Sequence, residues 1–109
     1  MNIGLYFGTF NPVHIGHLII ANYMAGYTGL ERIWMVLTPR NPFKNKETLL
    51  EDYHRLALLR IAIENNPKLE ACDIEFGLPK PSYTYKTLAY LKDKYPQHQF
   101  NLKIGRAHV

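Results

Sequence analysis

The amino-acid sequence predicts an α/β fold in which a parallel sheet is flanked by helices. Short apolar segments typical of buried strands alternate along the chain with longer segments of helical periodicity. Such alternation is typical of parallel sheets, because each crossover between parallel strands contains a helix. Four strands are predicted, at residues 3–7, 32–37 and 69–75 and from His98 or Gln99 onward.

Three helices are predicted between these strands. The first covers residues 15–27. The second begins with a capping-box pattern, in which Thr48 and Glu51 can satisfy each other's backbone donors, and it ends at the Asn-Asn-Pro of residues 65–67. The third helix ends at Tyr95. Five apolar side chains of the second helix fall at helical spacing: Leu49, Tyr53, Leu56, Leu59 and Ile63.

Composition and charge narrow the class of protein. The chain has 109 residues, of which 47% are hydrophobic and 20% charged, and its formal net charge is +4, as expected of one globular domain. It contains no apolar run of membrane-spanning length and no signal-peptide pattern. Its Lys and Arg residues are scattered, and its single cysteine cannot form an internal disulfide. We therefore expect a cytoplasmic protein that binds neither membrane nor nucleic acid.

Some conspicuous side chains are expected to be structural. Trp34 and Cys72 are assigned to the core, and His54 to the surface. Asp73 and Glu75 alternate with apolar residues in the third predicted strand, so they are expected to face solvent.

Residues 8–17, Gly-Thr-Phe-Asn-Pro-Val-His-Ile-Gly-His, form the most informative segment. His14 and His17 lie on one face of the first helical turn. Alone, the pair would indicate surface residues or a weak metal site, but no third metal ligand is evident. Gly8 lets the backbone approach a ligand, and Gly16 costs helix stability and so makes room for something. A strand, a glycine turn and a helix start together predict a phosphate-binding site.

Phosphate chemistry needs only a small set of side chains. A phosphate monoester has a second pKa near 6, so it is already an ionised nucleophile at neutral pH. A protein that brings it to a second phosphorylated substrate must align two polyanions and disperse developing charge. Backbone amides, histidines and lysines suffice for this, with Mg²⁺ on the phosphates.

Three segments follow predicted strands and should lie at one edge of the sheet. They are residues 8–17, the lysine-bearing loop of residues 39–46, and residues 81–85. Ligands of open parallel sheets bind beyond the carboxyl ends of the strands. The order of the elements therefore predicts a common binding edge.

These three segments resemble a known family. Residues 8–17 resemble the HxGH signature of the nucleotidyltransferase superfamily. Residues 37–46 and Pro-Ser-Tyr-Thr-Tyr-Lys-Thr-Leu, residues 81–88, are similar to segments of bacterial nicotinate-nucleotide adenylyltransferases. The resemblance covers residues 1 to about 102 and implies a Rossmann-like nucleotidyltransferase fold.

The resemblance also implies roles for individual residues. His14 and His17 would be catalytic, binding the phosphates of ATP and stabilising the transition state. Lys44 or Lys46 would contact phosphate. Tyr83, Thr84 and Tyr85 would line the nicotinate pocket. The implied ATP-binding set is Gly8, Thr9, Phe10, His14, Gly16 and His17.

The function implied is transfer of the adenylyl group of ATP to nicotinate mononucleotide, which gives deamido-NAD and pyrophosphate in NAD biosynthesis. Mg²⁺ would accompany ATP, and no metal site on the protein is predicted. One alternative is the same chemistry on nicotinamide mononucleotide or phosphopantetheine, and another is an inactive ATP-binding fragment. A small basic nucleic-acid binder is disfavoured by the scattered charge.

The last residues form an unusual ending. Residues 104–109 match the translation of a widely used sequencing-adapter sequence. We therefore expect residues 103–109 to be non-native and residues 1–102 to be the N-terminal part of a nucleotidyltransferase domain, truncated at about the fourth strand. The family's later G-x-D and S-x-T-x-x-R motifs are missing from this chain, so we expect the isolated chain to be impaired.

Overall fold

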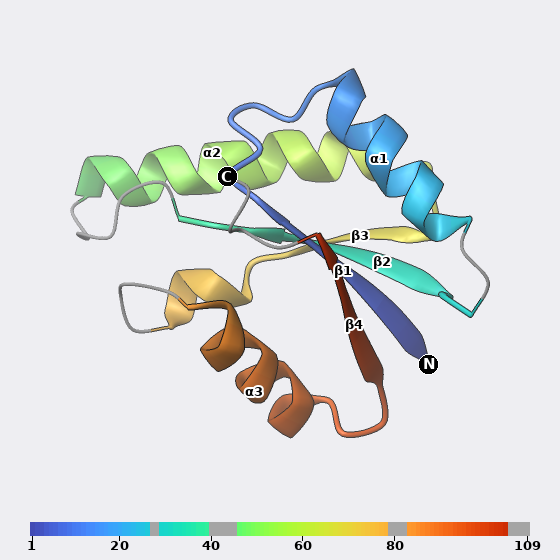
Figure 1. The fold of residues 1–109 in the computed structure, drawn as a ribbon. Coiled ribbons are helices and arrows are strands. Elements are labelled where there is room, and N and C mark those ends of the chain that lie inside the picture. The colour runs from blue at the N-terminus through green and yellow to red at the C-terminus, as the bar shows by residue number, and fades with distance from the viewer. Residues whose placement is uncertain (27–28, 40–45, 79–82, 105–109) are drawn as a thin grey trace.

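The computed structural model describes residues 1–26, 29–39, 46–78 and 83–104, and for residues 46–50, 103 and 104 it describes the backbone only. Four strands form one parallel sheet in the order β3-β2-β1-β4, with β1 and β2 at its centre (Figure 1). Leu5 of β1 lies opposite Trp34 on one side and Leu102 on the other. The predicted parallel α/β fold is therefore confirmed. The strands are β1 (Asn2–Gly8), β2 (Arg32–Leu37), β3 (Leu69–Cys72) and β4 (Gln99–Ile104).

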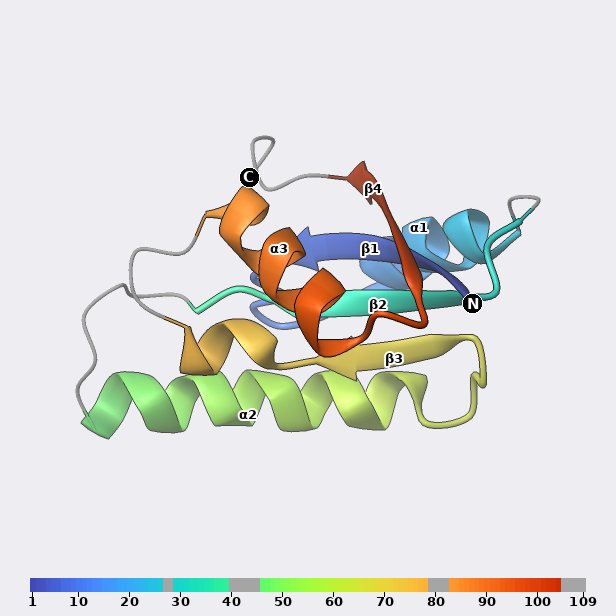
Figure 2. The same cartoon turned by 90° about the horizontal axis from the view of Figure 1, so that it is seen from below.

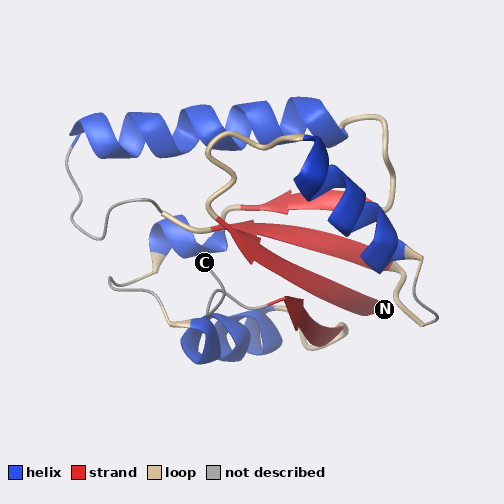
Figure 3. Cartoon of the chain, turned by 45° about the horizontal axis from the view of Figure 1, so that its top comes forward, coloured by secondary structure: helices blue, strands red, loops and turns tan. Residues whose placement is uncertain are grey.

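The helices lie on both faces of this sheet. Helices α1 (Ile15–Ala25) and α2 (Lys46–Ile63) cover one face, while the short 3₁₀ helix η1 (Ile74–Gly77) and helix α3 (Thr84–Lys94) lie on the other (Figures 2 and 3). Each crossover returns the chain to the same end of the sheet, so the carboxyl ends of all four strands share one edge.

Two apolar clusters hold the layers together. On the α1 and α2 face, the predicted stripe of α2 is buried at Leu56, Leu59 and Ile63. On the α3 face, Trp34 is 8% exposed and packs edge-on against Phe100, which confirms its assignment to the core. Burial of side chains from every strand fixes the sheet against its helices.

Three boundary predictions differ from the structure, the first being the end of α1, which lies at Ala25 instead of residue 27. Helix α2 begins at Lys46, so Thr48 lies inside the helix and is not its capping residue. Strand β3 ends at Cys72, three residues early, because Asp73 adopts φ −105° and ψ 18°, outside the strand region. The chain then turns into η1, which buries Glu75 completely instead of leaving it in solvent.

The predicted non-native segment is described only in part. The backbone of residues 103 and 104 continues β4, in which Ile104 pairs with Tyr6. Residues 105–109 lie outside the described residues, so their origin stays a prediction.

Candidate functional site

The turn after β1 is shaped by a buried aromatic ring. Phe10 has a φ of 45°, a left-handed conformation that bulky residues rarely adopt. Its ring is buried and packs edge-on against Tyr6 and His17, with centroid distances of 5.3 and 5.0 Å. A Cβ atom on Gly8 would lie 3.1 Å from Cζ of Phe10. The space beside Gly8 is therefore occupied by the ring of Phe10. The predicted contact of Gly8 with ATP stays a prediction.

The two histidines of the motif form the N-terminal cap of α1. Nδ1 of His14 accepts a hydrogen bond from the Gly16 N–H at 3.0 Å, and Nδ1 of His17 accepts one from the His14 N–H at 3.0 Å. The rings stack with their centroids 3.8 Å apart. Because each Nδ1 accepts, the proton of each neutral ring is assigned to Nε2. The pair thus offers two N–H donors at a helix N-terminus, where anions are favoured.

The electrostatics of the pair favour the neutral form of His17. Burial lowers the pKa of His17 below its ordinary value of 6.5, and the nearby charge of His14 lowers it further. His17 is therefore a neutral hydrogen-bond donor at pH 7, and its Nδ1 remains free to accept the capping bond.

Gly16 has a packing reason to be glycine. A Cβ atom there would lie 2.8 Å from Cε1 and 3.0 Å from Nδ1 of His14. The sequence indicated that Gly16 makes room for another group. In the structure that group is the imidazole of His14.

A buried ion pair that the sequence reasoning missed lies beneath this turn. Arg55 and Asp52 of α2 are 3% and 5% exposed, and Nη2 of Arg55 donates to Oδ1 of Asp52. Nη1 of Arg55 donates to the backbone oxygens of Thr9 and Thr38. The signal was present, because these two positions are in phase with the buried stripe of α2.

A second cluster holds the start of α3. The hydroxyl of Thr87 donates to Oε2 of Glu75 at 2.8 Å, and both residues are fully buried. Tyr83 and Tyr85, at the start of the helix, are exposed and stacked at 5.9 Å. The Glu75 contact therefore fixes the first turn of α3 beside the predicted nicotinate residues.

The predicted site residues are brought to one edge only in part. The histidine pair begins α1, whereas Tyr83, Thr84 and Tyr85 begin α3, and these two helices lie on opposite faces of the sheet (Figures 1 and 2). Both groups follow carboxyl ends of parallel strands, as predicted. Lys44 lies outside the described residues, and the side chain of Lys46 is not described.

Comparison with known proteins identifies the family. A family model described as cytidylyltransferase-like matches residues 5–102. The chain belongs to the cytidylyltransferase-like family. Together with the histidine turn at the end of β1, this agrees with the nucleotidyltransferase fold expected from the sequence.

Several curated proteins are similar to this cytidylyltransferase-like chain over nearly all of its length. A probable nicotinate-nucleotide adenylyltransferase of Flavobacterium psychrophilum is 61% identical over 105 residues, which are 96% of this chain and 54% of that protein. One of Bacteroides fragilis is 50% identical over 102 residues, 94% of this chain and 51% of that protein. The chain thus spans about half the length of the curated relatives it matches.

A solved structure supports the same fold. Nicotinic acid mononucleotide adenylyltransferase of Plasmodium falciparum, complexed with NaAD, superposes with a TM-score of 0.74 at 25% identity. The match covers 95% of this chain and 51% of that chain.

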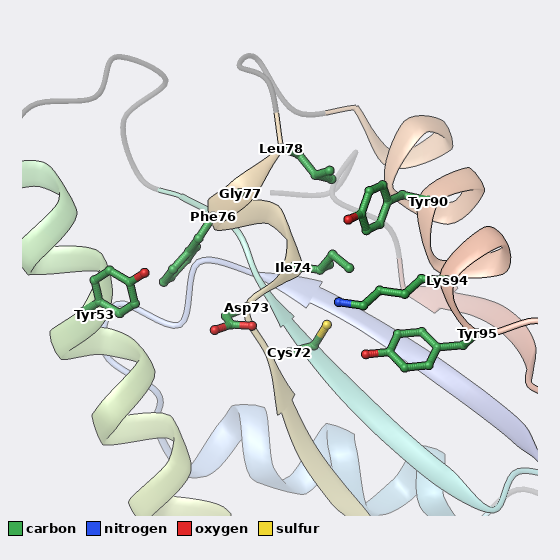
Figure 4. Close-up of a pocket in the computed structure, with 10 residues that line it drawn as sticks. All are labelled: Tyr53, Cys72, Asp73, Ile74, Phe76, Gly77, Leu78, Tyr90, Lys94 and Tyr95. Carbon is green, nitrogen blue, oxygen red and sulfur yellow. The ribbon is translucent and has the colours of Figure 1, made fainter.

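One cavity of this cytidylyltransferase-like chain lies away from the histidine turn. A cavity of about 320 Å³ lies between η1, the end of β3 and α3, with Cys72, Tyr90 and Lys94 among its lining residues (Figure 4). None of the described motif residues lines it. Burial raises the pKa of the Cys72 thiol to about 11, so this cysteine is a poor nucleophile, in keeping with its predicted structural role.

The described residues show no metal-binding cluster and no membrane-spanning helix. Those residues include no group of three His, Cys, Asp or Glu side chains placed to hold a metal ion. No described helix is both long enough and apolar enough to cross a bilayer.

Proposed function

We propose that this chain supplies the ATP-handling part of an enzyme that transfers the adenylyl group of ATP to nicotinate mononucleotide, with release of pyrophosphate. The observation that carries the proposal is the stacked His14–His17 pair at the N-terminus of α1, directly after β1. The names of the relatives, which are adenylyltransferases acting on nicotinate nucleotide, supply the substrate.

The proposed mechanism rests on charge stabilisation. The phosphate of nicotinate mononucleotide is ionised at neutral pH and attacks the α-phosphorus of ATP, while the bond to the pyrophosphate leaving group breaks. His14 and His17 would each donate an Nε2–H to phosphate oxygens, and these donors matter most as negative charge builds on the leaving group. The Phe10 N–H, which has no acceptor among the described residues, would add a third donor.

Mg²⁺ enters this proposal as part of the substrate. Mg²⁺ prefers oxygen ligands, whereas the described side chains at the turn are imidazoles. The described residues therefore offer no protein cage for the ion, which would be carried by the phosphates of ATP and would neutralise part of their charge.

The acceptor nucleotide would lie toward the start of α3. Tyr83 and Tyr85 are exposed, stacked aromatic side chains suited to packing against a pyridine ring. Thr84 and either Lys44 or Lys46 would complete the contacts. We propose that the reaction occurs in the cytoplasm and involves neither nucleic acid nor membrane.

The test compares two proteins. The first is the 109-residue chain, and the second is a chimaera in which residues 1–102 precede the remaining half of the Flavobacterium psychrophilum relative. Pyrophosphate release is measured with ATP and each of nicotinate mononucleotide, nicotinamide mononucleotide and phosphopantetheine. We expect the chimaera to prefer nicotinate mononucleotide and the short chain to be slow. A chimaera that prefers phosphopantetheine, or that binds ATP without turnover, would contradict the proposal.

A further inference from the structure

Arg55 lies where the two loops on the α1 and α2 face begin. One of its guanidinium nitrogens, Nη1, donates to the carbonyl oxygen of Thr9, in the motif turn, and also to that of Thr38, 3.2 Å away, directly after β2. The other terminal nitrogen donates to Asp52. A single buried side chain therefore joins the histidine turn to the start of the lysine-bearing loop.

The contact with Thr9 determines where the next N–H points. A peptide unit is planar and trans, so its C=O and N–H point in opposite directions. Because Arg55 holds the carbonyl of Thr9, the N–H of Phe10 must point away from α2. That N–H has no acceptor among the described residues, and it belongs to a residue with a left-handed φ of 45°. Such a conformation persists only where the surroundings impose it.

The second contact joins neighbouring strands at the same place. The N–H of Thr38 donates to the carbonyl oxygen of Gly8 at 2.8 Å, while its own carbonyl accepts from Arg55. The ends of β1 and β2 are thus cross-linked by a backbone bond and by a guanidinium. Movement of one loop start therefore moves the other.

The hydrogen bonding of Arg55 favours a positioning role over simple core filling. Buried polar groups are almost always satisfied, yet Nε of Arg55 has no partner among the described residues. The side chain thus leaves one buried donor unused while its terminal nitrogens reach the carbonyls of two loops. An apolar residue would fill this space at lower cost.

We propose that Arg55, held by Asp52, is a positioning residue that aims the Phe10 N–H at phosphate and couples the histidine turn to the loop after β2. The proposal deepens the proposed function and rests on it, since it assumes that the turn binds the phosphates of ATP. Arg55 itself is buried and would not touch the nucleotide.

The test uses the 109-residue chain and three variants. Arg55→Lys keeps a cation beside Asp52 but lacks the planar fork that reaches several acceptors. The double variant Asp52→Asn with Arg55→Met removes both charges together, and so provides a folded comparison if Arg55→Lys is unstable. The control is Arg60→Met, which removes an arginine of the same helix whose side chain is 59% exposed and lies 3.9 Å from Asp73.

Two quantities are measured at a temperature where urea unfolding shows each variant to be fully folded. One is the position of the Phe10 backbone amide resonance without ligand, and the other is the affinity for ATP. We expect Arg55→Lys and the double variant to shift the Phe10 resonance and to weaken ATP binding by about tenfold, the effect of one well-placed hydrogen bond. Arg60→Met should change neither.

The outcomes separate this inference from the proposed function. If the wild-type chain does not bind ATP, the assigned ATP-binding role of the turn fails, and the ligand-free Phe10 resonance alone decides whether Arg55 positions it. If the wild type binds ATP and the Arg55 variants keep both the affinity and the Phe10 resonance, the inference is overturned. A merely structural role would lower stability without weakening ATP binding in fully folded protein.

Discussion

The space beside Gly16 is filled by the imidazole of His14, whose Cε1 atom lies 2.8 Å from where a Cβ on Gly16 would be. The same imidazole accepts a hydrogen bond from the Gly16 N–H. Gly16 and His14 therefore act as one unit, in which the missing side chain allows the cap and the cap orients the ring.

Gly16→Ala should separate stability from binding. The new methyl group displaces the ring of His14 and removes a helix cap worth about 1 kcal/mol, but alanine in place of glycine returns about 1 kcal/mol of helix propensity. We expect the free energy of unfolding, measured with urea, to change by less than about 1 kcal/mol. The affinity for ATP should fall, because the stacked histidine pair is lost. Gly77→Ala is the matched control, since a Cβ there meets nothing within 4 Å. Unchanged ATP affinity in Gly16→Ala would contradict the assigned role of the pair.

His17→Ala should act on the chemical step. In the chimaera we expect kcat to fall by about 10²-fold or more, as when one donor to a developing negative charge is removed, with a much smaller rise in KM for ATP. Steady-state pyrophosphate release measures both constants. A change confined to KM would reduce His17 to a binding residue.

The pH dependence of the helix cap follows from the lowered pKa of His17. Its folded pKa lies below the ordinary 6.5, so the unfolded chain binds this proton more readily. The contribution to stability is therefore complete above about pH 6.5 and is lost as pH falls through the folded pKa. Protonation at Nδ1 also removes the acceptor for the His14 N–H. An NMR titration of the imidazole C–H signals should give His17 a pKa below 6.5, and a value above it would contradict this account.

Thr87→Val should show how much the buried Glu75 contact stabilises α3. The substitution keeps the shape of the side chain but removes the hydroxyl partner of a fully buried carboxyl group, which should lower the free energy of unfolding by about 1–3 kcal/mol. Thr87→Ser keeps the hydroxyl and loses one methyl group, at a cost of about 1 kcal/mol. If the serine variant is the less stable of the two, packing rather than the hydrogen bond fixes this turn.

Cys72 should react slowly with thiol reagents. At pH 8 a thiol with a pKa of about 11 is roughly 10²-fold less ionised than an ordinary cysteine. We expect modification of the native chain by a chromogenic disulfide to be slower by at least that factor than in urea. Equal rates in the two conditions would contradict the burial of this thiol.

The elements predicted correctly from the sequence are those whose residues carry their own signal. The apolar run of β2 was placed to the residue, because a strand covered on both faces needs continuous apolar side chains. The His14–His17 pair was predicted because residues three apart on a helix always share a face. Neither inference depends on which distant segments come into contact.

The errors arise where contacts between residues far apart in the sequence determine whether a side chain is buried. Alternation placed Glu75 in solvent, but the chain leaves the strand at Asp73 and turns the carboxylate toward Thr87, twelve residues further on. The burial of Arg55 was not predicted, because its partners, the backbone oxygens of Thr9 and Thr38, have no side-chain signature. Buried charge of this kind becomes visible only when the loops that it joins are in place.

The sheet order has a consequence for how the chain is made. One edge of β1 pairs with β2, where Ile3 lies opposite Arg32. The other edge pairs with β4, which is far away in the sequence, and there Asn2 lies opposite Gln99. A ribosome adding about 5–20 residues per second takes roughly 5–20 s to bridge that interval. During this time β1 offers an open edge to which other strands could pair. Pairing with β4 is therefore the step that closes the second edge of the strand that leads into the histidine turn.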